Sequence, residues 1–281
     1  METTLRGKTT TVRISPELPT VIIGERINPT GKKRLAEALQ AGDLSLVREL
    51  AQAQVEAGAG VLDVNVGAAG VDEVSVLPRA VEAVAEVVDV PICVDTANPE
   101  ALAAALAVCP GKPLVNSVTG EEAKLAAVLP LVAEYHTAVI GLVMDDDGIP
   151  PTPERRLEVA RKIRARAAEL GIPPEDVIFD PLVLTVGAEP EAGRIALETI
   201  SLMRAELDAN VTAGASNVSF GMPDRHLLNQ VFLAMAISCG VNCPIGDPSH
   251  LCDVILAADV LLGRDKYGMR YIQACRTRKA R

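Results

Sequence analysis

The fold is decided by a repeated unit that is clearest in the stretch GASNVSFGMPDR, residues 214–225. Residues 215–220 have strand character, Gly-Met-Pro then breaks the strand, and an apolar segment of helical period runs from 225 to 239. Asn217 falls inside the predicted strand. An amide in an otherwise apolar strand is costly unless it is hydrogen-bonded, so we expect Asn217 to face a ligand.

The same strand–loop–helix layout recurs along the whole chain. The predicted strands are 21–26, 61–67, 91–96, 113–118, 138–144, 176–181, 215–220 and 241–247. The predicted helices are 34–57 with a break at Gly42-Asp43, 72–88, 100–108, 121–135, 152–170, 191–207, 225–239 and 251–262. Eight alternating units predict an α/β fold of the closed (β/α)₈ (TIM) barrel type. We expect one barrel domain over residues 20–281 and a loosely held arm over residues 1–19.

Composition narrows the class of protein. Hydrophobic residues make up 49% of the chain and Trp is absent, which predicts a large aliphatic core. A net charge of −10 argues against a nucleic-acid partner, and the one basic run, residues 276–281, is interpreted as a solvated tail. No apolar run is long enough for a membrane span, and no secretory signal is visible. Six irregularly spaced cysteines indicate reduced thiols and a cytoplasmic protein.

Polar residues occur at or near the predicted strand ends, where the active site of such a barrel lies. They are Glu25, Asn28, Asp63, Asn65, Asp95, Asn116, Asp180, Asn217 and Asp247. Each alone could be a turn former or a helix cap, as Asn98 before Pro99 is expected to be. As a set, carboxylates and amides can recognise a ring that offers both N–H donors and carbonyl acceptors, such as an aminopyrimidinone.

Six short motifs carry a family resemblance that extends from about residue 20 to 272. They are GERIN (24–28), LDVNVG (62–67), CVDT (93–96), VNS (115–117), FDP (179–181) and SNVS (216–219). In this order they resemble the pterin-binding barrel of the methyltetrahydrofolate:corrinoid methyltransferases, and the folate module of cobalamin-dependent methionine synthase is similar. The chain departs from one relative's pattern at residues 220–223, where FGMP replaces a more polar loop.

The resemblance implies a role for each matching residue. Asp95, Asn116 and Asp180 would hydrogen-bond the pterin ring, and Asn217 would approach N5, which carries the methyl group. Arg225 would lie near the aminobenzoyl-glutamate tail. A supporting floor would consist of Glu25, Asn28, Asp63 and Asn65.

The implied activity is transfer of a methyl group between N5 of tetrahydrofolate and the cobalt of a corrinoid (cobalamin). No D-x-H-x-x-G stretch is present to supply a cobalt ligand, so we expect the corrinoid on a separate partner protein. The resemblance also implies a homodimer, and no tightly bound metal is expected. The direction of transfer stays open, because acetogenesis and O-demethylation, methylamine or betaine breakdown would use the same residues.

Four alternatives remain. A catalytically silent pterin-binding subunit would keep Asp95, Asn116 and Asp180 without depending on Asn217. Dihydropteroate synthase shares this barrel, but residues 181–187 contain no Lys and no Arg-x-His pair follows the eighth strand. A Mg²⁺ site of three carboxylates is disfavoured by the interleaved amides. A zinc site is disfavoured by the spacing of its candidate ligands, which are Cys239, Cys243, His250 and Cys252.

Overall fold

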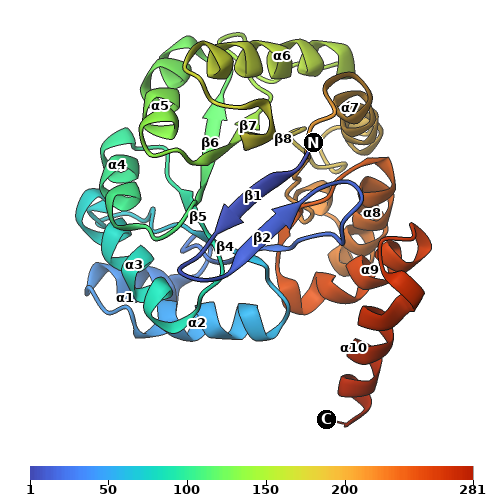
Figure 1. The fold of residues 1–281 in the computed structure, drawn as a ribbon, viewed down its shortest axis with the longest axis horizontal. Helices are drawn as coiled ribbons and strands as arrows, with labels where there is room; N and C mark the ends of the chain where they lie inside the picture. Colours follow the sequence, from blue (N-terminus) through green and yellow to red (C-terminus); the bar gives the residue numbers. More distant parts are fainter. Residues whose placement is uncertain (281) are drawn as a thin grey trace.

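A computed structural model describes residues 1–280, so Arg281, the end of the predicted basic run, lies outside the described residues. A ring of helices surrounds a curled parallel sheet (Figure 1). The sheet has the order β8-β7-β6-β5-β4-β3-β9. Its strands are β3 (Ile23–Ile27), β4 (Val61–Val64), β5 (Ile92–Asp95), β6 (Leu114–Thr119), β7 (Ala138–Leu142), β8 (Val177–Asp180) and β9 (Ile245–Gly246).

The ring closes between β8 and β9 through residues 211–214. Val211 forms parallel bridges to Phe179 on one side and Val241 on the other, and Gly214 bridges Ile245. This segment therefore occupies the seventh of the eight strand positions in chain order, although it contains no long ladder. The predicted (β/α)₈ barrel is confirmed.

Ten helices belong to the described residues. Their bounds are α1 (Lys33–Gln40), α2 (Ser45–Glu56), α3 (Glu73–Val87), α4 (Pro99–Val108), α5 (Glu122–Glu134), α6 (Pro153–Glu169), α7 (Ala192–Leu207), α8 (Arg225–Cys239), α9 (Pro248–Leu261) and α10 (Met269–Ala280). Several begin as the sequence dictates: α4, α6 and α9 each have Pro in the first turn, after a side-chain cap from Asn98, Thr152 or Asp247.

The predicted seventh strand, residues 215–220, is wrong. Asn217–Ser219 form a short 3₁₀ helix, η2, in which the Phe220 amide donates to the Asn217 carbonyl. The strand contacts end at Gly214, and the Asn217 amide already turns back to the Gly214 carbonyl. The Asn-Val-Ser-Phe alternation of polar and apolar residues imitates a strand, but the backbone of this segment turns into η2.

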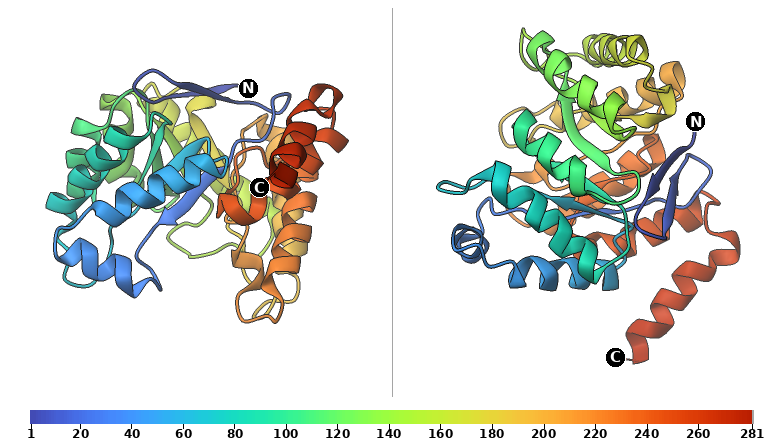
Figure 2. Two further views of the ribbon diagram at one scale, coloured as in Figure 1. Left: turned by 90° about the horizontal axis from the view of Figure 1, so that it is seen from below. Right: turned by 60° about the vertical axis from the view of Figure 1, so that its left-hand side comes forward.

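The predicted loose arm is instead an antiparallel hairpin of β1 (Thr3–Arg6) and β2 (Thr11–Ile14). It lies across the middle of the ring in Figure 1 and to one side of the barrel in Figure 2. Leu5 and Ile14 are fully buried and pack with Ile23, Val61 and Leu114 of the barrel interior. The alternation of these strands supplies one apolar face, which covers the end of the barrel opposite the strand ends of the candidate site.

The predicted basic tail is exposed at residues 276–278, and it belongs to a helix: residues 269–280 make α10, which stands apart from the ring (Figures 1 and 2). The Asp265 carboxylate accepts hydrogen bonds from the Arg270 and Tyr271 amides and so caps this helix. Arg278 forms an ion pair with Asp253 of α9.

The N-terminal hairpin should contribute to the free energy of unfolding. Truncating Leu5 to Ala leaves a cavity in the sealed end of the barrel, so the free energy of unfolding should fall by about 2–5 kcal/mol. Denaturant unfolding measures this change. Thr11→Ala on the exposed side of the same hairpin is the matched control and should have little effect. Equal stability of Leu5→Ala and wild type would mean that the hairpin does not seal the core.

Candidate active site at the strand ends

Two amide–carboxylate pairs join the ends of β4, β5 and β6. The Asn116 side-chain amide donates to Asp63 Oδ1 at 3.1 Å, and the Asn65 amide donates to Asp95 Oδ2 at 3.0 Å. The Asn65 oxygen accepts from the Gly67 amide at 2.8 Å, which fixes the orientation of the Asn65 side chain. Four of the sequence-predicted site residues thus form one network, although they are up to 53 positions apart in sequence.

The two carboxyl groups of this network are buried and each affects the pKa of the other. Asp63 is 2% exposed, and burial together with the neighbouring Asp95 carboxylate raises the pKa of Asp63 well above its usual range. Burial also raises the pKa of Asp95, while hydrogen bonds from Asn65 and Asp63 act in the opposite direction. Burial therefore disfavours the charged form of both carboxyl groups, and each accepts a hydrogen bond from an amide side chain.

Asp180 lies at the end of β8, apart from this network. Its Oδ1 accepts from the Leu182 amide at 2.8 Å, and burial raises its pKa to about 6. The loop that follows is held by Arg156 of α6, a buried guanidinium that donates to the carbonyls of Pro150, Pro181 and Leu182. The sequence analysis missed Arg156; its only signal is a charged residue on the apolar face of the predicted helix.

Asn217 stands over Gly214 at the closure of the ring. A methyl group added at Gly214 would come within 2.8 Å of Asn217 Nδ2, so a larger residue here would displace the Asn217 side chain. The backbone of Asn217 is used within η2, but its side-chain amide has no hydrogen bond to any residue in the described part of the chain. This amide is half-buried and available to a ligand.

Arg225, at the start of α8, braces the η2 turn. Its Nη2 donates to the Ser216 carbonyl at 3.0 Å and its Nε to Ser219 Oγ at 3.1 Å. The guanidinium carbon lies 4.4 Å from the centroid of the Phe220 ring. The side chain is therefore fixed beside Asn217.

The remaining strand-end residues have other contacts. Burial raises the pKa of Glu25, on β3. Asn28 accepts from the Thr30 amide, and Asp247 caps α9 and pairs with Arg26 at 3.2 Å, so both have the turn or cap contacts of ordinary loop residues. The structure does not link Asn28 to the network.

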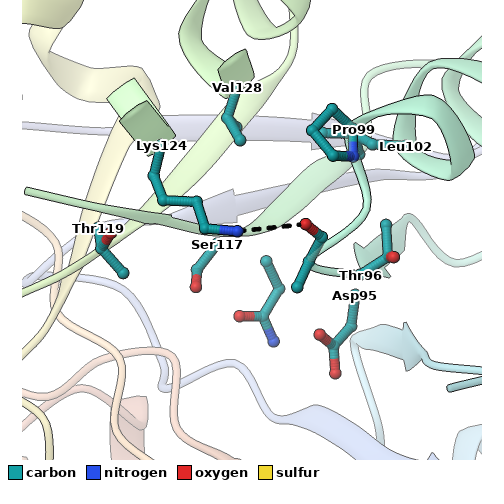
Figure 3. A pocket seen from close by; sticks show the side chains of 10 residues that line it. Asp95, Thr96, Pro99, Leu102, Ser117, Thr119, Lys124 and Val128 are labelled. Atoms are coloured by element: carbon teal, nitrogen blue, oxygen red, sulfur yellow. Dashed lines mark hydrogen bonds between the residues drawn. The ribbon is translucent and has the colours of Figure 1, made fainter. Parts of the chain in front are cut away.

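A cavity of about 130 Å³ opens beside the network. Figure 3 shows Asp95, Ser117 and Thr119 around it, with Lys124 of α5 reaching across to donate to the Ala97 carbonyl. Among the described residues that line this space, Lys124 is the one cation. Together with Asp95 and Asn116 it makes the cavity polar on the strand side and apolar at Leu102 and Val128.

The described residues do not support the zinc interpretation. Within residues 1–280, no group of three or more His, Cys, Asp or Glu side chains is placed to hold a metal ion. The buried Cys243 thiol lies near the Val211 carbonyl, and His250 packs edge-to-face on His226 with 5.3 Å between ring centroids. Over the same residues, no helix has the length and apolar character that a membrane crossing needs.

The site and fold define a class of barrel enzyme, and comparison with known proteins agrees. Residues 24–245 match the pattern of the pterin binding enzyme family. The chain belongs to this family. It is 33% identical over 267 residues to a methylcorrinoid:tetrahydrofolate methyltransferase of Eubacterium limosum, which covers 92% of this chain and 97% of the relative. The predicted resemblance to the folate and corrinoid methyltransferases is thereby confirmed.

A second relative is the methionine synthase of Mycobacterium tuberculosis, 31% identical over 86% of this chain, which corresponds to 21% of that longer protein. Among solved structures, a Yersinia pestis dihydropteroate synthase has a TM-score of 0.69 at 16% identity, covering 93% of this chain and 99% of that one. The Thermus thermophilus dihydropteroate synthase has a TM-score of 0.66 at 21% identity, covering 93% and 99%. The likeness to these structures concerns the fold alone.

Because the pKa of Asp180 is raised in the folded state, the free energy of unfolding should depend on pH. An unfolded aspartate titrates near about 4, so between that pH and about 6 the folded state binds more protons than the unfolded state. The contribution of Asp180 to stability therefore falls as pH rises through this window. Asp180→Asn stays neutral and can still accept from Leu182. It should unfold at a higher temperature than wild type near neutral pH, and this gain should shrink towards about pH 4.

Thermal unfolding across that pH range tests the prediction. Glu134→Gln, which removes an exposed carboxylate on α5, is the control for a general change in net charge. A gain from Asp180→Asn that is the same at every pH would show that the Asp180 carboxyl is not the titrating group.

Proposed function

We propose that the protein is a tetrahydrofolate methyltransferase that moves a methyl group between N5 of the folate and the cobalt of a corrinoid held by a partner protein. The observation that carries this proposal is the set of buried carboxylates and amides at the strand ends. It is supported by the Eubacterium relative, whose name contains both a methylcorrinoid and tetrahydrofolate.

The chemistry of the set fits a pterin ring. The pterin presents N–H donors and a carbonyl and ring nitrogens as acceptors on one edge. Asp180 in its ionised form accepts from the donors, while Asp95 and Asn116 supply an acceptor and an amide from the neighbouring wall. Asp63 and Asn65 hold those two side chains and contribute through them.

Methyl transfer requires stabilisation of N5 in the transition state, because a tertiary amine nitrogen is a poor leaving group. As the N5–CH₃ bond breaks, its electron pair stays on nitrogen, the methyl group bonds to cobalt(I), and a solvent proton ends on N5. The free amide of Asn217 can donate a hydrogen bond to N5 as this charge develops. The reverse reaction passes through the same transition state, so Asn217 serves either direction.

Removing this donor should lower turnover more than binding. Asn217→Ala should reduce kcat by about two orders of magnitude, which is the usual loss of one preorganised donor, with the Kd for tetrahydrofolate nearly unchanged. Single-turnover methyl transfer with a corrinoid protein, alongside calorimetric binding, measures both quantities. A small effect on turnover would favour a silent pterin-binding subunit or a different activating group.

Dihydropteroate synthase is the weaker assignment. The solved structures that support it share only 15% to 21% identity with this chain. The loop after β8, residues 181–187, has no Lys to hold a pyrophosphate leaving group.

We also propose a homodimer, and its surface is the apolar face of α8 and α9, which lie side by side in the ring (Figure 1). Leu227, Val231 and Met235 are each about half exposed although they recur at helical spacing. Leu227 and Val231 border, together with α9, a groove of about 360 Å³. No charged residue occurs in α8 between Leu227 and Cys239. Depletion of charge at an exposed apolar patch is typical of an interface.

A second copy is the occupant that this surface fits. Two copies with a net charge of −10 each repel, so they can approach most easily through a neutral patch. The face lies on the side of the barrel, which leaves both strand-end sites open to a partner. A cytoplasmic location is proposed with it, since all six cysteines are free.

A charge in the centre of this face should separate the copies. Val231→Asp should be a folded monomer where wild type is a dimer, because an unpaired carboxylate would be buried on association. Size-exclusion chromatography with light scattering gives the mass directly. Leu170→Asp, at another exposed leucine, should leave the dimer intact. A monomeric wild type, or a dimeric Val231→Asp, would contradict the proposed surface.

A further inference from the structure

Arg156 is a buried cation in an unfavourable place. Its side chain is only 2% exposed, and it lies in the first turn of α6, where the positive end of the helix dipole opposes a cation. The neighbouring Arg155 pairs with Glu158 on the helix surface, whereas Arg156 forms no ion pair within residues 1–280. An unpaired buried charge destabilises the folded chain, so we expect this side chain to have a role in the nearby site.

The Arg156 guanidinium joins two loops at the strand-end face of the barrel. Its Nε donates to the Pro150 carbonyl at 2.9 Å, in the loop after β7. Its Nη1 donates to the carbonyls of Pro181 at 2.8 Å and Leu182 at 3.0 Å, in the loop after β8. All three acceptors are neutral. These hydrogen bonds therefore fix the two loops and leave the positive charge without a counter-charge.

The loop conformation that Arg156 holds also directs the Asp180 carboxyl. Leu182 has a φ of 61°, a left-handed conformation that leucine rarely adopts. While its carbonyl accepts from Arg156, its amide donates to Asp180 Oδ1 at 2.8 Å. Oδ1 is fixed by this contact, and Oδ2 has no hydrogen bond to any residue in the described part of the chain. Asp180 thus presents one oriented, unused acceptor oxygen.

The charge of Arg156 acts on the same carboxyl group. Burial raises the pKa of Asp180 to about 6, while the Leu182 amide and the Arg156 charge act in the opposite direction. The Cys243 thiol also faces Asp180, but burial raises the pKa of this thiol, so it is uncharged near neutral pH. Among the described residues that affect Asp180, Arg156 is therefore the one charged group that favours its carboxylate form.

We propose that Arg156 is a positioning residue of the ligand site: it acts through Asp180, by holding the Leu182 turn and by placing a positive charge near the carboxylate. Asp180 Oδ2 is then ready to accept from an N–H donor of the ligand. This inference rests on the proposed function and adds a residue that lies outside all six sequence motifs. With a neutral residue at position 156, a larger share of Asp180 should be protonated and unable to bind the ligand as a carboxylate.

The first test uses the free protein. Arg156→Gln removes the charge and keeps an amide donor for the loop carbonyls. Carbon-13 NMR titration of the Asp180 carboxyl, assigned by the loss of its signal in Asp180→Asn, should give a midpoint about one pH unit above that of wild type. Arg156→Lys keeps the charge and should titrate close to wild type. Arg155→Gln, which removes an exposed charge from the same turn of α6, is the matched control and should have no effect.

The second test is calorimetric binding of methyltetrahydrofolate as a function of pH. In wild type, affinity should rise with pH through about 6, as Asp180 becomes a carboxylate. At about pH 6, Arg156→Gln should bind roughly fivefold more weakly than wild type, because a midpoint one pH unit higher lowers the ionised fraction by this factor. The two affinities should converge towards about pH 8.5, where Asp180 is ionised in both proteins.

Each other outcome contradicts a particular step. An unchanged Asp180 midpoint in Arg156→Gln, or an Arg156→Lys variant that titrates like Arg156→Gln, would overturn the role of Arg156. An equal loss of affinity at every pH would mean that Arg156 only supports the loops, which also overturns it. Failure of wild type to bind methyltetrahydrofolate would overturn the proposed function, whereas the NMR titration does not depend on the ligand. Arg156→Met is the second neutral variant if Arg156→Gln does not fold.

Discussion

The account depends on buried carboxylates that are held by amides and not by cations. Asn116 donates to Asp63 and Asn65 to Asp95, and burial raises the pKa of both carboxyl groups. A cationic side chain in place of these amides would have neutralised the negative charge of the carboxylates. Amide donors instead stabilise the charge in part and leave lone pairs for a ligand, at a cost to the stability of the free protein. Such a site is suited to a neutral heterocycle rich in N–H groups.

The closed barrel is what brings these side chains together. Parallel strands end at one edge, so Asp63, Asp95 and Asn116 come from adjacent strands and Asp180 from farther round. The other end is sealed by the N-terminal hairpin through Leu5 and Ile14. The end of the barrel under the hairpin is thus closed by apolar packing. The polar side chains gather at the opposite end, where the strands end.

Periodicity and residue type were enough to predict the barrel and the convergence of Asp63, Asn65, Asp95 and Asn116, because both follow from where strands end. They did not predict the segments whose conformation is set by local hydrogen bonds or by contacts with residues far away in sequence. Asn217 is in a 3₁₀ turn since its backbone bonds to Gly214, and the hairpin is ordered by contacts with strands far away in sequence. Arg156 could not be assigned because its partners are carbonyl groups, which every residue has.

Binding of methyltetrahydrofolate to wild type and to Asp180→Ala, measured by calorimetry, tests the central claim most directly. Asp180 is the acceptor at the end of β8, it lies outside the amide-linked network, and its burial makes it costly to keep without a ligand. We expect clear binding by wild type and its loss in the variant. Absence of binding by wild type, or binding that survives in Asp180→Ala, would contradict a pterin pocket at these strand ends.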